Sequence, residues 1–526
     1  MASEALTIVP ATAAPMAWRP VIRMAGRVVA VAALLGLIGQ LLFFDVGLGI
    51  NLPIAIGLLL VGGWLVRRRT PSLANPDAWL APGALLFAAF AALRADPTIV
   101  ALDLLTSLAL AGGALAAFGG LRVVARPFWG LVALGFGALG WASAGAGPAL
   151  AQARESLPST GSLRPRAGRT LPVLRGMVIA VPIVLIFVAL FSAADAVFAQ
   201  VIENVFDVDV DFGDLPGRLL VAAALAWIAA GCMALAAAEH RSGDLQHADP
   251  ARGLRVGTTE AVTVLAAVAV VFLLFVALQG AYLFGGLDTL EATGMTYAEY
   301  ARRGFFELVA VAFLAGGLVI GIERLVRDRT RLVVGMAAAL VVLTGVVIVS
   351  SALRLRLYQE AYGWTELRFY VLATIVLLAF GAIALLTALA ADRVRWIGHA
   401  LIGGALVIGL VLNFIGPVRF ISEQNVARVL DPSLVPAGGS SGLDELYAIS
   451  LADDALPALA RALAALDDGE ATYLAGALGW RLVELRDDDG RTHGRHGMPD
   501  ARLRATRSRL PSGEASCPDI GRPIVR

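Results

Sequence analysis

The chain has 526 residues, of which 58% are hydrophobic and 16% are charged, and its formal net charge is +1. Soluble globular proteins have about 25% charged residues, so this composition excludes an ordinary soluble domain. The balanced charge gives no indication of nucleic acid as a partner. The apolar residues form runs of about 20, the length that a helix needs to cross a bilayer. The predicted fold class is therefore all-α: a polytopic transmembrane helical bundle of about twelve spans with a small C-terminal helical segment, whose first partner is the lipid bilayer.

The chain begins with an N-terminal arm, 1–27, which is followed by an N-terminal transmembrane segment group, 28–150. Arginines follow the second and fourth runs of this group and predict that these ends are cytoplasmic. If every run crosses the bilayer, the next segment lies outside. The last run, rich in Gly and Ala, is the weakest, and an interfacial or re-entrant path there would bring that segment inside. The runs lie at about 28–44, 47–66, 78–93, 99–119 and 127–147.

A basic linker, 151–175, divides the chain, and its arginines predict a cytoplasmic position beside the following span. The core transmembrane bundle then occupies 176–415. Basic loops at 239–255 and 323–331 are predicted to be cytoplasmic, which places 353–368 outside. The apolar runs of the core lie at about 176–199, 216–238, 260–284, 305–322, 332–352, 369–390 and 395–415.

An extracytoplasmic helical segment, 416–485, follows the last span. It starts with an amphipathic stretch, 416–430, and continues with short helices in which apolar residues recur at helical spacing. The remaining residues, 486–526, are polar and rich in arginine, which predicts a disordered tail.

No motif identifies a cofactor or a metal site. Gly135, Gly137 and Gly140 match the dinucleotide-binding pattern, but they lie inside an apolar run without a preceding strand. Small residues that pack helices are the better interpretation, and the same holds for Gly317 and Gly321. We predict no cofactor and no metal, and we assign no catalytic residue.

The most unusual stretch is 353–370, which lies between two long apolar runs and combines aromatic residues with charges of both signs. Such charges are costly beside lipid unless they pair. The stretch 296–308 starts another span with Glu307, which we expect to point into the bundle. Asp195 is a carboxylate near the end of a span, and Asp103 is a similar but weaker case. We predict one outer-face polar site formed by Asp195, Tyr300, Arg303, Glu307, Arg356, Tyr358, Tyr362 and Arg368. The alternative is an aromatic belt with unconnected ion pairs.

Several motifs in the second part of the chain recur together in one uncharacterised family. They are FSAADAVFA, YARRGFFELVAVA, RLRLYQEAYGWTELRFY, the segment 425–428 and LADDALPAL. Through them the chain resembles the bacterial membrane family catalogued as domain of unknown function 4173, over roughly 175–459. The resemblance implies a multi-pass bacterial membrane protein, which we expect in the cell (inner) membrane. It implies no known activity.

Three functions remain open, in this order. The first is a structural, sensing or interaction protein of the cell envelope, with an envelope protein partner. The second is a transporter or channel for a small solute or ion, supported by the number of spans and by Asp195, Glu307, Gln279 and Asp103 in or near spans. The third is a membrane-embedded enzyme that uses outer-face carboxylates as acid or base.

Overall fold

The computed structural model describes residues 25–67, 75–147, 215–238, 256–284, 305–436, 439–466 and 468–488. Within these ranges the regular structure is helical apart from isolated bridge residues, among them Val256 and Val326, which pair in parallel. Among the described helices, eight are long and apolar enough to cross a membrane, and three shorter apolar helices accompany them. Each predicted span coincides with one of these helices, except 176–199, which lies outside the described residues. The predicted all-α fold is confirmed, and the protein is an integral multi-pass membrane protein.

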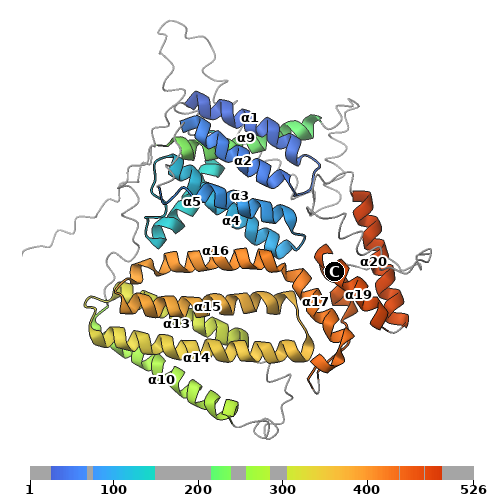
Figure 1. Ribbon diagram of the computed structural model, residues 1–526. Coiled ribbons are helices and arrows are strands. Elements are labelled where there is room, and N and C mark those ends of the chain that lie inside the picture. The colour runs from blue at the N-terminus through green and yellow to red at the C-terminus, as the bar shows by residue number, and fades with distance from the viewer. Residues whose placement is uncertain are drawn as a thin grey trace, which may run out of the picture.

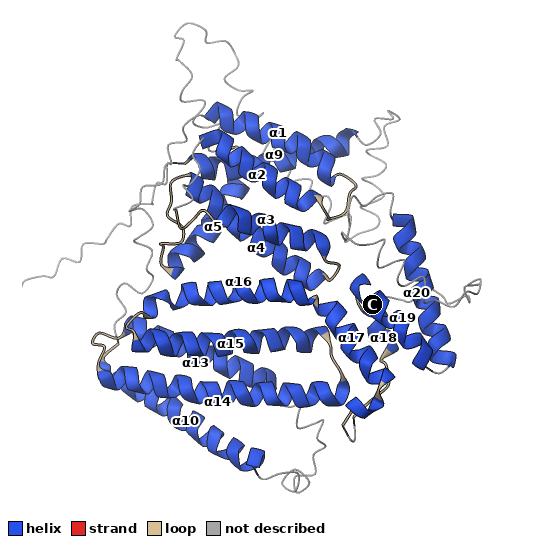
Figure 2. Cartoon of the chain, in the orientation of Figure 1, coloured by secondary structure: helices blue, strands red, loops and turns tan. Residues whose placement is uncertain are grey.

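The helices form two groups and a C-terminal cap at one end (Figure 1). The first helix group contains α1 (Ala25–Phe43), α2 (Asn51–Arg67), α3 (Leu80–Leu93), α4 (Pro97–Phe118), α5 (Phe128–Ala144) and α9 (Leu215–Ala237). The second helix group contains α10 (Thr258–Phe284), α13 (Phe305–Leu325), α14 (Arg331–Tyr362), α15 (Glu366–Ala390) and α16 (Ile397–Ile415). The C-terminal cap contains α17 (Pro417–Leu430), α18 (Glu445–Ser450), α19 (Leu456–Ala462) and α20 (Asp468–Asp488). Figure 2 shows the long helices α14, α15 and α16 running nearly parallel, as expected for spans of one bilayer.

Helix α9 packs with the first helix group, although it follows the predicted linker in the chain. Gly36 on α1 lies so close to Ala222 and Ala226 on α9 that a side chain at this position would clash. Small residues on both helices permit this close approach of their backbones. Met233 and Ala234 of α9 are buried in the core that α2, α3 and α4 share. The first group is therefore completed by a helix from later in the chain.

The glycines that the sequence predicts as packing positions behave differently. Gly135, Gly137, Gly140, Gly317 and Gly321 have no described residue within 4 Å of the point where a Cβ would stand. The prediction that they pack helices is therefore wrong within the described part of the chain. Small residues in an apolar run permit close packing, but they do not determine which face of a helix meets a neighbour.

The bundle has two ends, which we name after Gly363 and Arg329. The Gly363 end, at the right in Figure 1, carries the α1–α2, α3–α4 and α14–α15 turns and the C-terminal cap. The Arg329 end, at the left, carries the α13–α14 and α15–α16 connections. At this end Arg67 donates hydrogen bonds of 3.2 Å to the carbonyls of Ala237 and Ala238, which ties α2 to the end of α9.

Helix α5 starts at the Arg329 end but stops partway through the first group. Its first residue, Phe128, packs against Gly398 at the start of α16. At its other end, Trp227 donates its indole N–H to the carbonyl of Ser143 at 3.0 Å, and Gly145 lies against the same ring with a φ of 55°. Trp227 lies midway along α9. This position of the α5 terminus agrees with a run that enters the bilayer without crossing it.

The predicted outer loop within 353–370 is largely helical. Helix α14 continues to Tyr362, and the connection to α15 is a short turn at Gly363. Gly363 has a φ of 76°, a conformation that favours glycine and ends the helix. An ion pair of 2.7 Å between Arg356 and Glu360, four residues apart, supports the added turns. Helix α14 is longer than the predicted span because hydropathy identifies the apolar part of a helix that lies in the bilayer, and not the residue at which the helix ends.

One apolar core joins the C-terminal cap to both helix groups. Ile99 of α4, Phe369 of α15 and Leu412 of α16 are buried in it. The cap contributes Val418, Ile421, Val426, Leu456, Leu459 and Leu474 to the same core. The cap therefore covers the Gly363 end of both groups.

Candidate functional site

A cavity of about 1560 Å³ lies between the two helix groups, and we call it the inter-group cavity. Residues of α4, α5 and α9 line it from the first group, and residues of α15 and α16 line it from the second. Its lining side chains are mainly aliphatic, and Asp103 is the only charged one among those described. Sites for drug-sized ligands are commonly about 300–1,000 Å³. The inter-group cavity therefore has room for a molecule of lipid size.

Helix α16 touches the first helix group at both ends of this cavity. At the Gly363 end, the rings of Phe414 and Phe90 lie 5.8 Å apart in an edge-on arrangement. At the Arg329 end, a Cβ added to Gly398 would lie 2.6 Å from the Cβ of Phe128, so only glycine fits there. Between these ends, Leu406 of α16 packs against the core of the first group, and Gly409 lies near Phe87, so the inter-group cavity lies beside these contacts.

Asp103 marks the polar end of the cavity. It lies on α4, about 9 Å along the helix axis from Pro97, and only 2% of its surface is exposed. The side-chain amide of Asn413, on α16, donates to Asp103 Oδ1 at 2.7 Å and to the Gly409 carbonyl at 3.0 Å. Asp103 Oδ2 and Asn413 Oδ1 are buried and have no donor in the described part of the chain. Two acceptors thus remain unpaired at one place, which costs about 1–3 kcal/mol each if nothing binds them.

Arg94 supports this pair from the α3–α4 turn. Its guanidinium donates to the main-chain carbonyl of Asn413 in the last turn of α16, where a cation is favourable. Burial lowers the pKa of Arg94, while the nearby Asp103 carboxylate acts in the opposite direction. Arg94 Nε is buried and has no acceptor among the described residues. The polar end therefore combines unpaired acceptors with one unpaired cationic donor.

Asp96 lies near Asp103, but each of its carboxylate oxygens already accepts a hydrogen bond. Its Oδ1 accepts the N–H of Thr98 at 2.8 Å and so caps α4, and its Oδ2 accepts the hydroxyl of Tyr370 at 2.7 Å. Tyr370 comes from α15 and lines the cavity. Sequence analysis missed Arg94, Asp96 and Asn413. The Asp96-Pro97 pair at the start of a span is a helix-capping signal that would have identified one of them.

His399 lies at the opposite end of the cavity. Both of its ring nitrogens are buried without a partner in the described chain, and its ring lies 4.9 Å from that of Trp396. His399 and Asn413 are both on α16, so their separation along the axis is about 21 Å. That length exceeds half of the roughly 30 Å hydrocarbon core of a bilayer. The inter-group cavity is therefore long as well as wide.

A second polar constellation fixes the turn at Gly363. Asn425 of α17 accepts the main-chain N–H of Trp364 at 2.7 Å and donates to its carbonyl at 2.8 Å. Arg428, one helical turn later, donates to the carbonyls of Gln359, Glu360, Ala361 and Ser440. The first three belong to the last turn of α14, where Gln359 also accepts the N–H of Gly363 and Ala361 also accepts the N–H of Ser440. Burial lowers the pKa of Arg428, and the nearby Arg368 adds to this. We call Asn425 and Arg428 the α17 clamp.

The structure brings together three of the eight residues predicted for the outer-face site. The Arg368 guanidinium lies 4.0 Å from the centre of the Tyr358 ring, and Arg368 donates to the carbonyls of Tyr362 and Gly363. The rings of Tyr358 and Tyr362 lie 5.3 Å apart. These contacts support the turn beside the α17 clamp.

The other members of the predicted site are placed differently. Arg356 is exposed and pairs with its helical neighbour Glu360. Glu307 is exposed in the first turn of α13, so the expectation that it points into the bundle is wrong. Asp195, Tyr300 and Arg303 lie outside the described residues. Convergence of all eight residues therefore stays a prediction.

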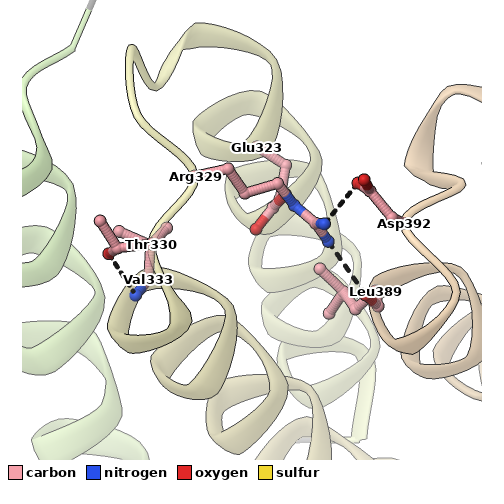
Figure 3. Close-up of polar contacts among 6 residues, drawn as sticks. All are labelled: Glu323, Arg329, Thr330, Val333, Leu389 and Asp392. Atoms are coloured by element: carbon pink, nitrogen blue, oxygen red, sulfur yellow. Dashed lines mark hydrogen bonds and ion pairs between the residues drawn. The ribbon is translucent and has the colours of Figure 1, made fainter.

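The Arg329 end has an ion-pair cluster, drawn in Figure 3. Arg329 pairs with Glu323 at 2.7 Å and with Asp392, and it donates to the carbonyl of Leu389 at 2.9 Å. Thr330 caps α14 by accepting the N–H of Val333. The cluster joins the α13–α14 connection to the α15–α16 turn. Its ion pairs hold these two connections together. In the described ranges, no group of His, Cys, Asp and Glu is arranged to hold a metal ion.

Comparisons with known proteins give the family. Neither the search of curated proteins nor that of solved structures found a match. A family model described as domain of unknown function (DUF4153) matches residues 81–462. The family number expected from the sequence motifs is therefore wrong, while a multi-pass membrane family of unknown function is confirmed. The match starts at α3, so it includes Asp103 as well as the α17 clamp. The chain belongs to the family of domain of unknown function (DUF4153).

Proposed function

We propose that this protein is a bacterial envelope protein that binds an amphipathic, lipid-like molecule in the inter-group cavity. The observation that carries the proposal is a cavity of about 1560 Å³ whose aliphatic walls contain one charged side chain. Aliphatic walls favour an apolar tail, and a single carboxylate at one end favours a polar head there. The proposal specifies a ligand for the first of the three functions that the sequence left open, a structural, sensing or interaction protein of the cell envelope.

The charge distribution supports an orientation for this ligand. Outside the C-terminal cap, most described arginines near helix ends lie at the Arg329 end: Arg67, Arg122, Arg126, Arg324, Arg327, Arg329, Arg331, Arg393 and Arg395. Fewer lie at the Gly363 end, namely Arg94, Arg218, Arg354, Arg356 and Arg368. Under the positive-inside rule the Arg329 end is cytoplasmic. Asp103 then lies on the outer side of the bacterial inner membrane, and the C-terminal cap is extracytoplasmic. The arginines of both helix groups predict the same orientation if α5 does not cross the bilayer. The end of α5 midway along α9 supports this.

Native mass spectrometry of the protein in mild detergent tests the proposal. Gly135 lines the cavity and has no described neighbour within 4 Å of the position of a Cβ, so Gly135→Trp is the variant that places a large side chain at the cavity wall. Gly137 is equally free of described neighbours but does not line the cavity, so Gly137→Trp is the matched control. We expect the wild type and the control to retain bound lipid. Gly135→Trp should weaken retention about tenfold, which corresponds to about 1.4 kcal/mol. Equal retention by both variants would refute the proposal.

An envelope protein partner at the C-terminal cap is the second candidate function. Leu446 on α18 is 74% exposed, Leu430 at the end of α17 and Leu434 shortly after it are also exposed, and all three lie outside the spans. Exposed apolar side chains outside the bilayer are candidates for a contact with another protein. We expect Leu446→Glu to reduce cross-linking of the cap to an envelope protein. Unchanged cross-linking would remove this candidate.

A further inference from the structure

The polar end of the inter-group cavity has a specific chemical requirement. Asp103 Oδ2 and Asn413 Oδ1 are acceptors, they are buried, and no donor in the described chain reaches them. Asn413 is fully buried and its amide already bonds Asp103 and Gly409, so it cannot turn without breaking two hydrogen bonds. Whatever fills this place must bring N–H or O–H donors to it.

Charge narrows the class of donor. Asp103 is the only charged side chain on the described cavity wall, and a buried carboxylate is favourable only when a cation or strong donors accompany it. Arg94 stands beside it, but its visible hydrogen bond goes to the carbonyl of Asn413. Of the carboxylates here, Asp96 has both oxygens occupied and is not on the wall. One carboxylate therefore remains to receive a positive group from the cavity.

We infer that the cavity selects a lipid whose headgroup carries a primary ammonium, which Asp103 binds through Oδ2. A primary ammonium has three N–H donors and can therefore satisfy Asp103, the unpaired acceptor that lines the cavity. A quaternary ammonium has the same charge but no N–H, so it leaves this carboxylate without a hydrogen-bond donor. This inference rests on the proposed function and adds the class of ligand to it.

A methylation series tests the inference on the wild-type protein. Nanodiscs of a neutral carrier lipid would be doped with phosphatidylethanolamine, its N-methyl and N,N-dimethyl forms, phosphatidylcholine or phosphatidylglycerol, and bound lipid counted by native mass spectrometry. Phosphatidylcholine cannot form the charge-assisted hydrogen bond to Asp103, so we expect it to bind at least tenfold more weakly than phosphatidylethanolamine. Equal binding across the series would overturn the inference and would mean that buried water satisfies the acceptors.

Variants separate this inference from the proposed function. Asp103→Asn keeps the shape and the acceptor for Asn413 but removes the negative charge, so lipid should still bind without preference for the primary ammonium. Asp96→Asn changes a carboxylate of the same corner that is off the cavity wall, and it should keep the preference. Unfolding midpoints establish that both variants fold. If Asp103→Asn keeps the full preference, the inference is wrong.

Competition identifies the source of the ammonium group. Free phosphoethanolamine at millimolar concentration should not displace the bound lipid, because it lacks the tails that the aliphatic walls bind. Displacement by the free compound would overturn the assignment to a lipid. Loss of all lipid binding in the wild type, and no difference between Gly135→Trp and Gly137→Trp, would instead refute the proposed function.

Discussion

Each end of the bundle has a central arginine, but the two arginines have different partners: main-chain carbonyls at the Gly363 end and mainly carboxylates at the Arg329 end. At the Gly363 end, Arg428 is 9% exposed and bonds four main-chain carbonyls. At the Arg329 end, the Arg329 side chain is 27% exposed and pairs with Asp392, which is 81% exposed, and with Glu323, whose side chain is 1% exposed. Partners that water cannot replace are costly to lose, whereas exposed ion pairs contribute little. The comparison indicates that the Gly363 end, with the cap over it, is the rigid end of the molecule.

The largest effect should come from Arg428→Ala. This change removes the donor that the described chain gives to the carbonyls of Glu360 and Ser440, and one of the two donors to the carbonyls of Gln359 and Ala361. We expect a loss of about 3 kcal/mol or more, seen as a lower unfolding midpoint in detergent. Arg428→Lys should rescue little, because an ammonium cannot span four carbonyls as a planar guanidinium does. Full rescue by lysine would show that charge alone matters there.

Asn425→Ala should have the next largest effect. It removes both hydrogen bonds to the main chain of Trp364, at a cost of about 2 kcal/mol. Asn425→Asp is the matched variant, because it keeps the acceptor for the Trp364 N–H and loses only the donor. Its unfolding midpoint should fall between those of the wild type and Asn425→Ala. If both variants behave like the wild type, the α17 clamp does not hold the turn.

Tyr447 gives the Gly363 end a predictable response to alkaline pH. Its hydroxyl accepts the Glu366 N–H at 2.8 Å, and burial raises the pKa of Tyr447 to about 12. An unfolded tyrosine titrates near pH 10, so the neutral form is favoured by folding. The contribution of Tyr447 is therefore complete below about pH 10 and is lost as pH rises through about 12. The unfolding midpoint should fall across this window less steeply in Tyr447→Phe than in the wild type; identical slopes would contradict this prediction.

Asp392→Asn should have the smallest effect. The Asp392 side chain is 81% exposed, so losing its ion pair with Arg329 should cost about 1 kcal/mol or less and should matter even less at high salt. The unfolding midpoint measured at low and high salt checks this. A loss as large as that of Arg428→Ala would remove the contrast between the two ends.

Sequence patterns predicted the parts of the fold that depend on local composition. Apolar runs located the spans because the bilayer sets their length, and the Gly- and Ala-rich run proved to be the helix that ends beside Trp227. The extension of α14 was not predicted, because its outer turns contain Arg356 and Glu360, which look like loop residues on a hydropathy scale.

The candidate site depends on contacts that no local pattern encodes. Asp103 was noted as a carboxylate within a span, but its partner Asn413 is 310 residues away in the chain. Glu307 was expected to be buried because apolar residues follow it, yet helical periodicity turns its side chain to the surface. A conspicuous cluster of aromatic and charged residues therefore stabilises a turn, while a single inconspicuous carboxylate lines the cavity.

Occupancy of the inter-group cavity is the most direct test of the proposed function. Electron cryo-microscopy of the protein in nanodiscs formed with its native membrane lipids would locate any bound molecule. We predict elongated density along α16 between His399 and Asn413, with its polar end within hydrogen-bond distance of Asp103. Helices α4 and α16 packed together along their whole length, with no density between them, would contradict the proposal.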